Sequence, residues 1–230
     1  PRDVDFGGAA PGWQFGQQGY AFLRDGRVAA TMLDRATGET SLLVFDEDVA
    51  GVADVPAFVA ASLRAYGRAD GLPHSFGGLT PSADGTIYML GGGPDAPAGV
   101  YAWRALAEGG AEGGAEGGAE GGAAASPAEE LACSSSSRIP EGYVSVPKPV
   151  EFPCPLGTAH GYYYAPTNAA CASAEPAPPL LVKVHGGPTA CTSAGFNPGI
   201  QFWTSRGFAV LDVDYGGSTG YGREYRRRLR

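Results

Sequence analysis

The most constraining feature of this 230-residue sequence is residues 179–222, where a short apolar run, a glycine turn, a helical pattern and a second apolar run follow one another. Leu180 to Val184 is apolar except for Lys183, and it leads directly into His185-Gly186-Gly187-Pro188. An apolar run of this length that ends in glycine and proline favours a buried strand over a helix. The sequence therefore predicts a strand followed by a tight turn.

A helix and a second strand follow this turn in the expected order. Asn197 is a good N-cap, Pro198 suits the first helical position, and Gly207 is placed to end the helix. Phe208 to Tyr215 then has the composition of a strand that is covered on both faces. A strand, a crossover helix and a second strand form a βαβ unit, which implies a parallel sheet.

The first 106 residues have a different pattern, built from short strands and tight turns. Apolar runs and β-branched residues alternate with Asp-Gly and Thr-Gly pairs, which favours hairpins. On residues alone this is antiparallel β structure, either a sandwich or a β-propeller. The predicted strands are Tyr20 to Leu23, Arg27 to Leu33, Thr40 to Phe45, Thr86 to Leu90 and Gly99 to Leu106.

Residues 108–122 repeat the sequence EGGA, and the chain stays small and polar through Ser137. Such a segment buries too little apolar surface to offset the entropy of ordering it. We therefore predict a disordered, low-complexity insertion or linker over residues 108–140, interrupting the last hairpin. The Glu129-Glu130 pair within it is interpreted as solvated charge.

Two runs, LLVKVHGGPT and QFWTSRGFAVLDVDYGGSTGYGREYR, closely resemble the start of the peptidase domain in the prolyl oligopeptidase family, in particular its acylaminoacyl-peptidase and dipeptidyl-aminopeptidase-like members. GYVSVPKPVEFP and TAHGYYYAPTN are similar to the two strands that open that domain, and GQQGYAFLRDGRVA is similar to a late propeller blade. The resemblance implies a partial β-propeller over 1–107, the insertion over 108–140, and the N-terminal part of an α/β-hydrolase domain over 141–230.

The family resemblance also implies a function, a serine-type peptidase that releases dipeptides or acylated residues from short peptides. By this resemblance Gly187 donates a backbone N–H to the oxyanion of the tetrahedral intermediate, and His185 and Gly186 shape the loop. Glycines suit this role because they let the backbone approach the substrate closely. An isolated His-Gly-Gly would be interpreted as a plain strand-to-helix turn.

Gly216-Gly217-Ser218-Thr219-Gly220 fits the G-x-S-x-G pattern of a nucleophile elbow, but we predict that Ser218 is not the nucleophile. In the α/β-hydrolase fold the acid and the histidine follow the serine, and the twelve residues after Ser218 include neither Asp nor His. The expectation is a fragment that carries the oxyanion loop, lacks the nucleophile, acid and base, and is inactive alone.

Two other functions remain open, an esterase of the same fold and a non-catalytic propeller scaffold or pseudo-peptidase. The net charge of −8 becomes −2 without the six glutamates of residues 108–130, so acidity indicates no particular partner. Five arginines in Gly222 to Arg230 are interpreted as the exposed face of a helix, not as a nucleic-acid site. We expect no cofactor, metal or membrane partner, and four widely spaced cysteines favour reduced thiols in the cytoplasm.

Overall fold

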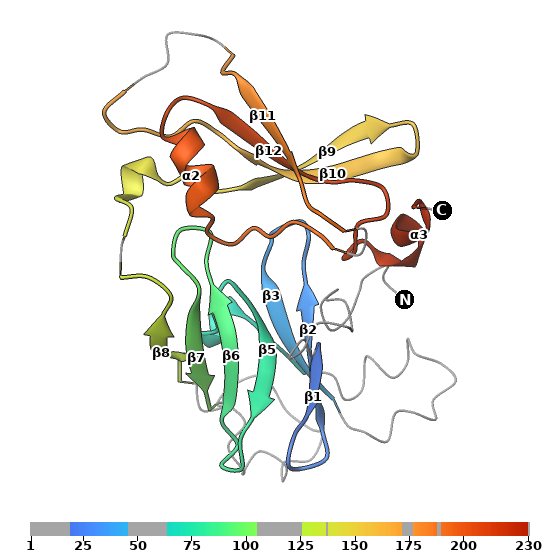
Figure 1. Ribbon diagram of the computed structural model, residues 1–230. Coiled ribbons are helices and arrows are strands. Elements are labelled where there is room, and N and C mark those ends of the chain that lie inside the picture. The colour runs from blue at the N-terminus through green and yellow to red at the C-terminus, as the bar shows by residue number, and fades with distance from the viewer. Residues whose placement is uncertain are drawn as a thin grey trace, which may run out of the picture.

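The computed structural model describes residues 19–45, 64–104, 126–136, 138–171, 177–187 and 190–229. In these ranges the chain forms three four-stranded sheets and few helices. Two antiparallel sheets lie below a mixed sheet in Figure 1.

The first sheet confirms the hairpins predicted near the N-terminal end. Its strands are paired in chain order, and the β1–β2 turn contains Gly26 at φ 86°, a conformation that favours glycine. Gly38 closes the β2–β3 turn by donating its amide to the carbonyl of Asp34 at 2.7 Å. The strands are β1 (Tyr20–Phe22), β2 (Val28–Leu33), β3 (Thr40–Phe45) and β4 (Arg64–Tyr66).

The second sheet is also an antiparallel meander in chain order, and its last strand corrects one prediction. Its strands are β5 (Ser75–Pro81), β6 (Ile87–Gly92), β7 (Gly99–Trp103) and β8 (Glu129–Cys133). We predicted disorder across 108–140, yet β8 pairs with β7, so the prediction is wrong for residues 126–136. Strand pairing uses backbone groups, which composition does not report. The EGGA repeats lie outside the described residues.

The two antiparallel sheets share one hydrophobic core. It includes Leu42 and Val44 from β3, Ile87 and Met89 from β6, and Trp103 from β7, all at most 2% exposed. The rings of Tyr66 in β4 and Trp103 in β7 meet edge to face at 5.1 Å, which joins the sheets directly. Four-stranded meanders packed in this way are consistent with a partial β-propeller.

The third sheet has the order β11-β12-β10-β9. Its strands are β9 (Lys148–Cys154), β10 (Gly157–Tyr164), β11 (Leu180–Val184) and β12 (Ala209–Asp214). β11 and β12 are parallel, as the strand–helix–strand pattern predicts, whereas β10 is antiparallel to both β9 and β12. A 3-10 turn at Glu141–Tyr143 precedes β9, which begins at Lys148.

The prediction that Leu180–Val184 is a buried strand is correct in its bounds and wrong in its burial. Leu180, Val182 and Val184 are 51%, 63% and 60% exposed. β11 is an edge strand, and these side chains project from the face opposite the one that the helix α2 (Pro198–Thr204) covers. An apolar pattern reports which side chains favour burial, not whether a partner element covers them.

The crossover helix α2 (Pro198–Thr204) begins where the sequence predicts. The Asn197 side chain accepts hydrogen bonds from the amides of Gly199 and Ile200. Ile200 packs on the sheet, and the buried Gln201 exchanges two hydrogen bonds with the backbone of Ser145. The C-terminal helix α3 (Gly222–Arg227) buries Tyr225 and exposes its arginines at positions 223 and 227.

Replacing Asn197 with alanine is expected to lower the free energy of unfolding by about 1 kcal/mol, because two amides of the first turn lose their acceptor. Asn197→Ser keeps an oxygen acceptor and is expected to retain most of the stability. Chemical denaturation of the three proteins measures the difference. Equal stability of Asn197→Ala and the wild type would show that water replaces the cap without loss.

The third sheet contacts the two lower sheets through the turns at their upper ends (Figure 1). From the β2–β3 turn, Arg35 reaches residues Thr192 and Thr219, and from the β6–β7 turn the carbonyl of Gly93 accepts the amide of Phe196 at 2.9 Å. The loops after β11 and β12 therefore lie at the junction between the parts of the molecule.

Candidate functional site

The turn after β11 is held by the side chain of His185. Its Nδ1 lies 2.7 Å from the carbonyl oxygen of Gly186, and its Nε2 lies 2.7 Å from Ser218 Oγ. A carbonyl only accepts, so a single neutral tautomer satisfies both contacts: Nδ1–H donates to Gly186, and Nε2 accepts from the Ser218 hydroxyl. The ring also stacks on Tyr215 at 4.4 Å. The imidazole thus anchors the turn to the loop after β12.

The two glycines of this turn remain exposed. A Cβ added at Gly186 would meet nothing within 4 Å, so packing within the described chain does not explain why this residue is glycine. Neither Gly186 nor Gly187 donates its amide to another residue that the structure describes. The turn is therefore exposed, with no backbone acceptor for either amide in the described part of the chain, at the carboxyl end of a parallel strand, where open α/β sheets bind their ligands.

Ser218, His185 and Asp214 lie together, but they do not have the arrangement of a catalytic triad. Ser218 is 0% exposed, which leaves its hydroxyl no access to a substrate. Asp214 Oδ1 lies 3.7 Å from Nε2, the nitrogen that also contacts Ser218, whereas a triad acid holds the other ring nitrogen. Sequence reasoning looked for a partner only after Ser218, and therefore missed that His185, which precedes it, contacts its hydroxyl.

Asp214, at the end of β12, is fully buried and accepts several hydrogen bonds. The Thr192 amide donates to Oδ1 at 2.7 Å, and the Thr192 and Tyr221 hydroxyls donate to Oδ2 at 3.2 and 2.7 Å. The hydroxyl of Tyr225 donates to the Asp214 carbonyl at 2.6 Å. Burial, reinforced by the nearby carboxylate, raises the pKa of Tyr221. Asp214 thereby connects the loop after β11 to α3.

Arg35 was not predicted from the sequence, yet it is the cation that faces Asp214. Its Nη1 lies 3.5 Å from Asp214 Oδ2, with side-chain exposures of 11% for Arg35 and 0% for Asp214. Burial opposes the guanidinium charge, but Cys191, Tyr221 and Asp214 more than offset this and raise the pKa of Arg35. No local pattern marks an arginine in a β-turn as an interface residue.

A cleft of about 600 Å³ lies between the two antiparallel sheets and the third sheet. Its lining includes His185, Arg35, and the ion pair between Lys183 Nζ and Asp212 Oδ2 at 2.5 Å. Burial raises the pKa of Asp212, against the opposing effect of Lys183. The cleft therefore joins the His185 turn to groups from both parts of the molecule.

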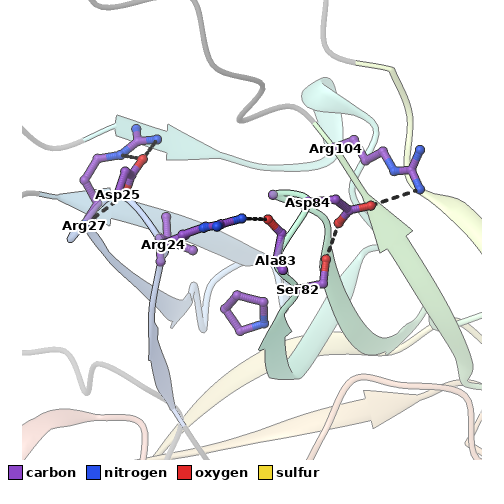
Figure 2. A pocket seen from close by; sticks show the side chains of 10 residues that line it. Arg24, Asp25, Arg27, Ser82, Ala83, Asp84 and Arg104 are labelled. Carbon is purple, nitrogen blue, oxygen red and sulfur yellow. Dashed lines mark hydrogen bonds and ion pairs between the residues drawn. The ribbon is translucent and has the colours of Figure 1, made fainter.

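A second cleft is lined by the β1–β2 and β5–β6 turns, at the ends of the antiparallel sheets that point away from the third sheet in Figure 1; Figure 2 shows it from close by. Its charged side chains have partners within the cleft: Arg27 pairs with Asp25, Arg104 with Asp84, and Arg24 donates to the carbonyl of Ala83.

Among the described residues no group of three or more His, Cys, Asp or Glu side chains is arranged to hold a metal ion. In the same residues, none of the helices has the length and apolarity that crossing a membrane requires.

Two curated proteins match a short part of the sequence, and no family model matches it. Dipeptidyl aminopeptidase BIII of Pseudoxanthomonas mexicana is 47% identical over 47 residues, which is 20% of this chain and 7% of that protein. Dipeptidyl peptidase family member 6 of Caenorhabditis elegans is 48% identical over 44 residues, 19% of this chain and 6% of that protein.

Solved structures match most or all of the chain. A puromycin-hydrolyzing peptidase of Mycobacterium tuberculosis is 32% identical with a TM-score of 0.72, and a puromycin hydrolase is 26% identical with a TM-score of 0.74. Both are matched over 100% of this chain, which spans 30% of their length. An acylaminoacyl peptidase of Pyrococcus horikoshii, 18% identical with a TM-score of 0.53, shares the fold. In sequence and fold, the chain is therefore similar to peptidases of the prolyl oligopeptidase family, of whose length it spans about a third or less.

Proposed function

We propose that this chain is the part of a serine-type peptidase of the prolyl oligopeptidase family in which the β-propeller meets the hydrolase domain. The whole protein would hydrolyse short peptides. In this proposal β1–β8 belong to a β-propeller and residues 141–230 open an α/β-hydrolase domain. The parallel pair β11–β12 with its crossover helix supports the second assignment. A propeller in front of the site would admit peptides and exclude folded proteins.

The observation that carries the proposal is the exposed turn His185-Gly186-Gly187 beside the cleft between the sheets. The Gly187 amide is assigned to the oxyanion, while His185 holds the turn through its contacts to Gly186 and Ser218. One such preorganised donor contributes about 3–4 kcal/mol to transition-state stabilisation in acyl transfer. The open space around Gly186 supports a role in ligand approach over a role in packing.

The purified 230-residue chain is expected to show no hydrolysis of aminoacyl- and dipeptidyl-aminocoumarin substrates, because Ser218 is buried and its histidine is not oriented by a carboxylate. Fluorescence release by the wild type and by Ser218→Ala measures this. Turnover by the wild type that disappears in Ser218→Ala would identify Ser218 as the nucleophile and contradict the assignment.

The oxyanion assignment is tested in the product of the complete reading frame. Gly187→Pro removes the amide proton and is expected to lower kcat for a dipeptide substrate by about 100- to 1,000-fold. Gly187→Ala keeps the amide and is the matched control, with a smaller loss expected. Equal losses in both variants would show that the N–H at this position is not the relevant group.

A further inference from the structure

Arg35 extends from the first sheet into the loops of the third. It lies in the turn between β2 and β3, the end of that sheet that faces the third sheet (Figure 1). Only 11% of its side chain is exposed, and its guanidinium lies 4.8 Å from the centre of the Tyr221 ring. A buried arginine needs several partners to offset the loss of hydration.

These partners come from two loops: the one after β11, which begins with the His185 turn, and the one after β12. Nη1 donates to the carbonyl of Thr192, in the loop after β11, at 3.2 Å. Nη2 donates to the carbonyl of Thr219, in the loop after β12, at 3.1 Å. The two partners lie 157 and 184 positions away in the sequence, so the planar fork of one side chain fixes two distant loops relative to each other.

Each of these loops is in turn connected to the His185 turn. Asp214, the ion-pair partner of Arg35, also accepts the Thr192 amide. Ser218, the residue before Thr219, donates its hydroxyl to His185. A Cβ added at Gly220 would collide with the guanidinium of Arg35, so the second loop closes directly against this group.

We propose that Arg35 is a positioning residue, through which the first antiparallel sheet holds the loops after β11 and β12 and so sets the orientation of the His185-Gly186-Gly187 turn. The meaning of that orientation for catalysis rests on the proposed function, but the coupling itself does not. A lysine keeps the charge and the ion pair with Asp214, yet its single ammonium cannot reproduce the fork that reaches both carbonyls.

Hydrogen–deuterium exchange of the purified chain tests the coupling without any substrate. The amide of Thr192 donates to Asp214 and that of Thr219 donates to the carbonyl of Ala190. In Arg35→Met, both amides are expected to exchange about 10-fold or more faster, because the two loops open more easily once their carbonyls lose the hydrogen bonds from a charged donor. Arg35→Lys is expected to lie between Arg35→Met and the wild type. The control is Arg24→Met, an exposed arginine at the opposite end of the same sheet that donates to the Ala83 carbonyl.

The amides of Leu42 and Leu43, in the core strand β3, report global unfolding in the same experiment. If Arg35→Met unfolds the chain, the test rests on Arg35→Lys. Faster amide exchange in Arg35→Lys that is confined to the two loops supports the proposal. Exchange that rises equally in β3 and the loops, or loops that match the wild type in Arg35→Lys and Arg35→Met, would overturn it.

In the product of the complete reading frame, Arg35→Lys is expected to lower kcat by about 10-fold or more with little change in KM, since small misplacements of a catalytic group slow the chemical step. A higher KM with an unchanged kcat would show that Arg35 acts on substrate binding and would contradict the positioning role. Absence of peptidase activity in the wild type would instead contradict the proposed function and leave the exchange result standing.

Discussion

Replacing Asp214 with alanine is expected to lower the free energy of unfolding by about 3–5 kcal/mol, the range found when one partner of a buried ion pair is removed. The substitution leaves the buried guanidinium of Arg35 without its carboxylate and deprives the Thr192 amide and the Tyr221 hydroxyl of their acceptor. Urea denaturation followed by circular dichroism measures the change.

Two further variants separate the charge of Asp214 from its hydrogen bonds. Asp214→Asn keeps an oxygen acceptor and is expected to lose less stability than Asp214→Ala. Glu224→Ala removes an exposed carboxylate that pairs with Arg227 and is expected to change the free energy of unfolding by less than about 0.5 kcal/mol. An Asp214→Ala effect as small as that of Glu224→Ala would contradict the role given to this cluster.

Trp103→Ala is expected to lower the free energy of unfolding by about 3–5 kcal/mol, as large-to-small substitutions in a closed core do. Trp103 is 1% exposed and contacts Tyr66 of the neighbouring sheet. Because the two antiparallel sheets share one core, we expect β1–β4 and β5–β8 to lose amide protection together. Hydrogen exchange of Trp103→Ala at low urea concentration measures this.

The matched control for the core is Leu131→Ala in β8, where the side chain is 49% exposed and little buried contact is lost. It is expected to change the stability by less than about 1 kcal/mol. If Trp103→Ala lowered protection only in β5–β8, the two sheets would be independent units and the shared-core interpretation would be wrong.

Features determined by local sequence could be predicted. Gly26 supports a hairpin turn, Asn197 caps α2, and the run from Leu180 to Val184 ends where the glycine turn begins. Each of these depends on backbone conformation within a few residues. The strand β8 was missed because its pairing with β7 comes from backbone hydrogen bonds, whereas its surrounding composition is small and polar.

In the candidate site, too, some features could be predicted from the sequence and others could not. The His185-Gly186-Gly187 turn could be found because a short motif marks it. The contacts that hold the turn could not, because Arg35 reaches Asp214 and Thr219 only after two sheets have docked. Likewise the apolar residues of β11 indicated burial, although covering that face requires an element from elsewhere.

Sequencing the transcript through the codon for Arg230 is the most direct test of the proposal that this chain supplies the oxyanion turn of a triad peptidase. We predict that the reading frame continues into a further strand, a second G-x-S-x-G motif, and then an Asp and a His in that order. A stop codon directly after Arg230 would contradict this, because Ser218, which lies beside His185 and Asp214, is fully buried and lacks the geometry of a triad nucleophile.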